Sequence, residues 1–149
     1  MYFWKTDLLV ADLRKSALGE KDFKNYYLAT SILIVVGFYL TMLEAREDML
    51  ALAIEAIGTL VVTVVGLNAA FTANGGPAGV RFLEKAVSIS FPLLMRVVAA
   101  GFAMGFLIGA LEIYGINKSQ MEWVGTTAII AIQGVFFWRL VVHVRSLHA

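Results

Sequence analysis

The chain has 149 residues, of which 60% are hydrophobic and 15% are charged. Soluble domains are about 45–50% apolar and about 25% charged, so this composition excludes an ordinary soluble globule and predicts an all-α integral membrane protein. The net charge of +1 provides no field that would attract nucleic acid, and the absence of cysteine excludes disulfides and thiolate metal sites.

Residues 1–25 form the longest polar segment, and their pattern predicts a cytoplasmic amphipathic helix at the membrane interface. Apolar side chains recur at helical spacing between charged ones. The apolar set is Phe3, Leu9, Val10, Leu13 and Ala17. We expect this helix to anchor the chain on lipid or on its own helices. Docking of a cytoplasmic or membrane protein partner on residues 1–25 is the alternative.

Four apolar stretches follow, over residues 26–43, 49–71, 87–111 and 123–142. A helix of about 20 residues crosses the ~30 Å of hydrocarbon in a bilayer. Helices are the expected form because they satisfy their own backbone hydrogen bonds inside lipid. Residues 26–149 are therefore predicted to form a single domain of four transmembrane helices.

Lysine and arginine predict the orientation of these spans. Nine of the twelve lie in the N-terminal segment, the second loop and the C-terminal end, two lie in the first and third loops, and Arg96 lies within a span. Because positive loops stay on the cytoplasmic side, both termini are predicted to be inside. The small size and short loops lead us to expect a bacterial inner (plasma) membrane.

The loop between the second and third spans contains Asn74-Gly75-Gly76, which predicts a tight turn. Pro77 suits the first position of a short helix after it. In the third span, Pro92 removes one backbone hydrogen bond, so a kink is expected there.

Polar residues inside the spans predict a buried cluster, because intramembrane charges usually face a partner. At 1.5 Å per residue, Glu55 of the second span lies ~9 Å from one surface and Arg96 of the third lies ~13 Å from the other. Gln133 of the fourth span falls near the same level, and Thr59 and Thr63 continue the stripe of Glu55. The cluster either fixes helix register or serves as an ion pathway, a proton-linked carboxylate or an anion site at Arg96.

A glycine ridge on the third span, made of Gly101, Gly105 and Gly109, lies opposite Arg96 at 100° per residue. Small residues at four-residue spacing let helices approach closely in lipid. The ridge is therefore expected to pack either on another copy of the chain or on the first or fourth helix of the same chain.

Three functions remain open from these features. A homo-oligomeric channel or pore-like protein is favoured by the ridge, the intramembrane charges and the short loops. An accessory or scaffold subunit of a larger membrane complex and a small proton-coupled transporter using Glu55 are the alternatives. We expect no enzyme activity, cofactor or metal site, because the two histidines, His143 and His148, lie beyond the last span.

Overall fold

A computed structural model describes residues 2–42, 47–113, 115 and 117–147, without the side chains of Glu20, Val35, residues 38–42, Glu112 and Ile113. The regular structure of the described part is all helical, as predicted, with no strand among the described residues. Its elements are α1 (Thr6–Arg14), α2 (Glu20–Met42), α3 (Met49–Ala73), the short helix η1 (Gly76–Ala78), α4 (Phe82–Ile113) and α5 (Lys118–Ser146).

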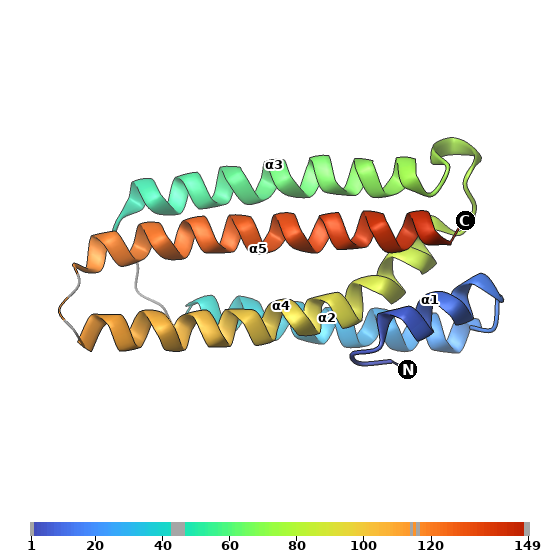
Figure 1. The fold of residues 1–149 in the computed structure, drawn as a ribbon, viewed down its shortest axis with the longest axis horizontal. Coiled ribbons are helices and arrows are strands. Elements are labelled where there is room, and N and C mark those ends of the chain that lie inside the picture. The colour runs from blue at the N-terminus through green and yellow to red at the C-terminus, as the bar shows by residue number, and fades with distance from the viewer. Residues whose placement is uncertain (1, 43–46, 114, 116, 148–149) are drawn as a thin grey trace.

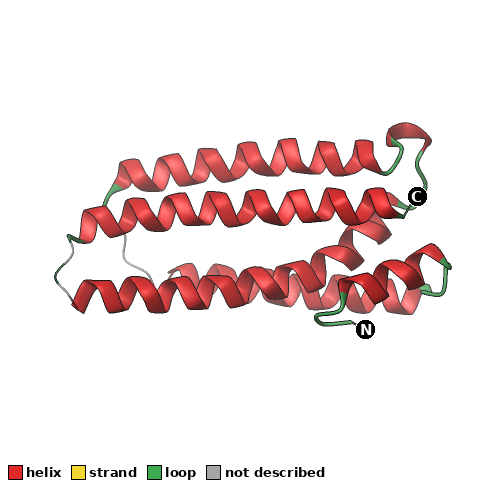
Figure 2. Ribbon diagram, viewed as in Figure 1, coloured by secondary structure: helices red, strands yellow, loops and turns green. Residues whose placement is uncertain are grey.

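The four long helices contact one another in the order α3, α5, α4, α2, and in Figure 1 α2 lies partly behind α4. Helix α5, the last in the chain, lies between α3 and α4, and α2 packs on α4. The short α1 packs across α4 and α5 at one end, which we call the α1 end. The described loops between α1 and α2 and between α3 and α4 are short (Figure 2). The helices thus form a row of neighbours and not a ring.

Three of these helices, α3, α4 and α5, are long and apolar enough to cross a membrane. No more than 11% of the residues in their most apolar stretches are buried within the chain. Large apolar side chains therefore face outward along their length, as lipid contact requires. Helix α2 covers the predicted first span up to residue 42, and Leu43 lies outside the described residues.

Polar residues cap the starts of α3 and α5, and α5 is longer at its start than the predicted span. Asp48 begins α3, and its carboxylate accepts hydrogen bonds from the backbone N–H groups of Leu50 and Ala51, each at 3.0 Å. Asn117 begins α5 and accepts from Ser119 N at 3.1 Å. Apolar patterns alone do not report such caps, so α5 begins five residues before the predicted span.

The predicted single helix over residues 1–25 is divided in the structure. Helix α1 ends at Arg14, Ser16 has a left-handed backbone with φ of 52°, and α2 begins at Glu20. The Asp22 carboxylate accepts from Gly19 N at 3.1 Å, which stabilises the new helix start. The predicted boundary at residue 25 therefore falls inside α2.

The apolar face of α1 packs on the protein's own helices. Leu9, Val10 and Leu13 are buried, whereas Phe3 and Ala17 of the predicted face are exposed. The side chains around them make up the main buried core, at the α1 end. Its other buried members are Tyr26, Ala70, Ile89, Phe91, Leu93, Leu140 and Val144.

Two tyrosines bind the segment before α1 to this core through hydrogen bonds. Tyr2 N donates to the Tyr26 hydroxyl at 2.7 Å, and the Tyr2 hydroxyl donates to an Asp12 carboxylate oxygen at 2.6 Å. This hydrogen bond to the carboxylate raises the pKa of Tyr2 above its ordinary value. The residues before α1 are thereby directed along α4 toward Arg96.

The turn predicted after the second span is present. Gly75 and Gly76 have φ of 96° and 55°, and η1 follows with Pro77 inside it. Helix α4 is continuous through Pro92 but bends in its first third (Figure 1). The hydroxyl of Ser88, four residues earlier, is buried and has no hydrogen-bond partner among the described atoms.

Candidate functional site

The interface between α3 and α5 is polar where both helices begin. The Trp123 indole Nε1–H donates to Asp48 Oδ2 at 3.1 Å. The Glu122 carboxylate accepts from the backbone N–H groups of Glu47 and Asp48 at 3.0 and 2.8 Å. Lys118 Nζ contacts Glu47 Oε1 at 2.6 Å. These bonds join the start of α5 to the start of α3.

Replacing Asp48 with alanine removes both the α3 cap and the acceptor for Trp123. We expect a loss of about 1–2 kcal/mol of stability, since a helix N-cap alone contributes about 1 kcal/mol. Asp48→Ser keeps a cap and loses the longer reach to Trp123, so it should lie between the alanine variant and the wild type. Thermal unfolding in detergent, followed by tryptophan fluorescence, measures this order; equal stability of all three chains would contradict it.

Three of the five residues of the predicted polar cluster, Glu55, Thr63 and Gln133, form hydrogen bonds across this same interface, and Thr59 lies between the first two on α3. Thr126, buried on α5, donates from Oγ1 to Glu55 Oε2 at 3.2 Å. Thr59 and Thr63 donate to carbonyls one turn earlier on α3, each at 2.8 Å. Gln133 Nε2 donates to Thr63 Oγ1 at 2.7 Å. The stripe of Glu55 thus faces α5.

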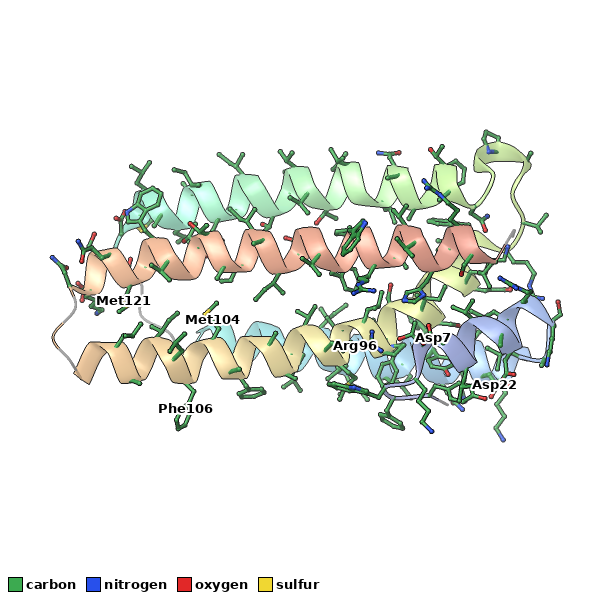
Figure 3. The ribbon with its side chains drawn as sticks, viewed as in Figure 1. Asp7, Asp22, Arg96, Met104, Phe106 and Met121 are labelled. Atoms are coloured by element: carbon green, nitrogen blue, oxygen red, sulfur yellow. The ribbon has the colours of Figure 1, made fainter. Side chains whose placement is uncertain are left out.

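Arg96 does not join this stripe. Its guanidinium Nη2 donates to the carbonyl of Trp4 at 2.7 Å, and its charge lies over the Trp4 ring, 5.9 Å from the centroid. Figure 3 places Arg96 toward the α1 end, near Asp7. The expected contact with Glu55 assumed that consecutive helices α3 and α4 are neighbours, whereas α5 lies between them.

The contact between Arg96 and Trp4 should protect the N-terminal segment from proteolysis. In Arg96→Gln the side chain no longer carries the charge that holds the Trp4 carbonyl, so trypsin is expected to cleave at Lys5 faster than in the wild type. Arg145→Gln, at an exposed position near the end of α5, is the matched control. Equal cleavage rates in the three chains would show that Arg96 does not hold the N-terminus.

A second glycine pair, which the sequence reasoning missed, lets α3 and α5 approach closely. A Cβ added at Gly58 would lie 2.6 Å from the Ile130 side chain, and one at Gly66 would overlap the ring of Phe137. Gly58 and Gly66 stand eight residues apart, which places them near one helix face. The sequence signal that could have predicted this close approach is the pair of small residues near the α3 face that carries Glu55.

The predicted ridge on α4 makes no close helix contact within the described part of the chain, although Gly101 lines a pocket between α4 and α5. Gly101, Gly105 and Gly109 are exposed, and a Cβ added at any of them would meet no described atom within 4 Å. Phe106 beside the ridge points away from the other helices (Figure 3). No described side chain of the same chain therefore packs closely on the ridge, while the side chains of residues 38–46, at the end of α2 and after it, lie outside the described part.

A cavity of about 440 Å³ lies between α4 and α5 and has two arginines, Arg96 and Arg139, in its lining. The Arg139 charge lies over the Trp138 ring, 5.0 Å from the centroid. No group of three or more metal-binding side chains is found among the described residues.

Comparisons of the chain with family models, curated proteins and solved structures give no match. The class of the protein therefore follows from its own residues. Three apolar helices with outward-facing side chains are those of a helical membrane protein.

Proposed function

We propose that the chain is a homo-oligomeric membrane channel or pore, crossing the membrane four times with both termini inside. The observation that carries the proposal is the open ridge of Gly101, Gly105 and Gly109 on an apolar helix. In lipid, such a ridge gains packing energy when a second helix lies close against it.

The arrangement of the helices supports a pathway between copies. Because α5 lies between α3 and α4, the described helices of one chain lie in a row and do not surround a common axis. If copies of the chain assemble in a ring, one helix face of each copy lines the central axis of the ring. Short loops and the absence of a described domain beyond the helices fit a protein whose activity lies in the membrane.

The polar stripe favours a second candidate, a proton-coupled transporter. The Glu55 carboxylate meets Thr126 at the α3–α5 interface, on a helix long and apolar enough to cross a membrane. A carboxylate at such a position can bind and release a proton. An accessory subunit is the third candidate, in which the ridge receives a different protein.

Flux through liposomes distinguishes these functions. A pore predicts that reconstituted protein dissipates an imposed K⁺ gradient and that Glu55→Gln retains this leak. A transporter predicts transport driven by a proton gradient and lost in Glu55→Gln. Thr127→Val, at an exposed threonine of α5, controls for loss of a polar group elsewhere. Intact gradients with wild-type protein would contradict the pore.

A further inference from the structure

The cavity between α4 and α5 is charged at one end and apolar at the other. Along α4 its lining runs from Leu93, which precedes Arg96 by three residues, to Ala100, and along α5 from Arg139 back to Ala131. Because the two helices run in opposite directions (Figure 1), both arginines lie toward the α1 end. The rest of the lining is apolar and consists of Leu93, Val97, Ile132, Val135 and Phe136.

The charge at the α1 end of the cavity is not neutralised by ion pairs. The described contacts of Arg96 are with Trp4, and that of Arg139 is with Trp138. Among the described residues, neither arginine forms an ion pair with a carboxylate. Asp7, Arg96 and Arg139 all interact electrostatically with His143. Two guanidinium charges and one carboxylate charge therefore act in this region.

Two exposed tryptophans beside the arginines favour a membrane surface at this end of the cavity. Trp4 and Trp138, the rings beside the two arginines, are 53% and 59% exposed. Exposed tryptophans on membrane helices are enriched at the level of the lipid headgroups. From Arg139 to Ala131 the α5 lining covers eight residues, or ~12 Å, which is somewhat less than half of the ~30 Å hydrocarbon core.

We propose that this cavity binds one anionic phospholipid, with its phosphate on Arg96 and Arg139 and one acyl chain along the apolar lining. Guanidinium groups donate two parallel hydrogen bonds to phosphate, and basic pockets between membrane helices suit anionic headgroups. The cavity volume falls within the range of small-molecule sites, about 300–1,000 Å³. This binding is independent of whether copies of the chain assemble.

Native mass spectrometry tests the proposal on full-length protein released from nanodiscs of phosphatidylglycerol and phosphatidylcholine in equal amounts. The wild type should retain phosphatidylglycerol in preference to phosphatidylcholine. Arg139→Gln should lower that retention about tenfold, as expected when one charge-assisted contact is lost. Arg145→Gln, on the same helix but outside the cavity, should stay close to the wild type.

The acyl chain is tested separately from the phosphate. Ala131→Phe fills the apolar end and should lower phosphatidylglycerol retention, whereas Ala53→Phe on the exposed face of α3 should not. Inorganic phosphate should fail to displace the lipid. Equal losses in Arg139→Gln and Arg145→Gln would overturn the site in favour of general surface charge. Displacement by inorganic phosphate, with Ala131→Phe unchanged, would overturn the lipid in favour of a simple anion.

Discussion

Replacing Gly66 with alanine is expected to destabilise the protein by about 1–3 kcal/mol, the cost of overfilling a well-packed site. The added Cβ would overlap the Phe137 ring, on the side of α3 that faces α5. It would also lie 2.5 Å from Phe137 Cβ, which a rotation of the ring does not move away. Gly66→Leu, with a larger side chain, should disrupt the α3–α5 interface and release the bond between Gln133 and Thr63.

Unfolding in detergent with increasing dodecyl sulfate measures this effect. Gly37→Ala on α2 is the control, because a Cβ there meets no described atom within 4 Å. The control should be neutral or slightly stabilising, since alanine favours helix over glycine by about 1 kcal/mol. If both variants were equally stable, α3 and α5 would not pack as closely as the structure shows.

Gly105→Leu is expected to abolish self-association while leaving the single chain folded. Gly105 is exposed at the centre of the α4 ridge, so leucine there disturbs no described contact within one chain. Between chains, it holds the two backbones apart and removes the close approach that glycine permits. The ion leak proposed for the assembly should disappear with it.

Gly134→Leu on α5 is the matched control, since a Cβ at Gly134 also meets no described atom within 4 Å. Crosslinking in liposomes reports assembly, and helical content measured by circular dichroism reports folding. Loss of crosslinking in both glycine variants would indicate a general effect of bulk. Retained crosslinking and leak in Gly105→Leu would remove the ridge from the interface.

The helices could be predicted from the sequence because long apolar runs between polar segments determine them directly. The start of α5 could not be predicted in the same way, since its cap Asn117 acts through a side-chain hydrogen bond that hydropathy does not register. The division of residues 1–25 depends on the backbone of Ser16, where φ is 52°. Serine carries no strong preference for that conformation, so the pattern of apolar residues predicted one helix.

The candidate site was predictable only within one helix pair. The spacing of Glu55, Thr59 and Thr63 placed them on one face, and that face meets α5 through Gln133 and Thr126. Which helix stands next to which is decided by packing between elements far apart in the sequence. Arg96 was therefore assigned to the wrong partner, and its contact with the Trp4 carbonyl has no pattern in the sequence.

The central claim is that copies of this chain assemble through the α4 ridge. The most direct test is the mass of the purified protein in nanodiscs, with the protein contribution separated from that of lipid. The claim predicts five or more copies for the wild type, enough to surround a pore, and a single copy for Gly105→Leu. A wild-type mass of one or two copies would contradict the pore and leave the transporter and the accessory subunit as the functions to test.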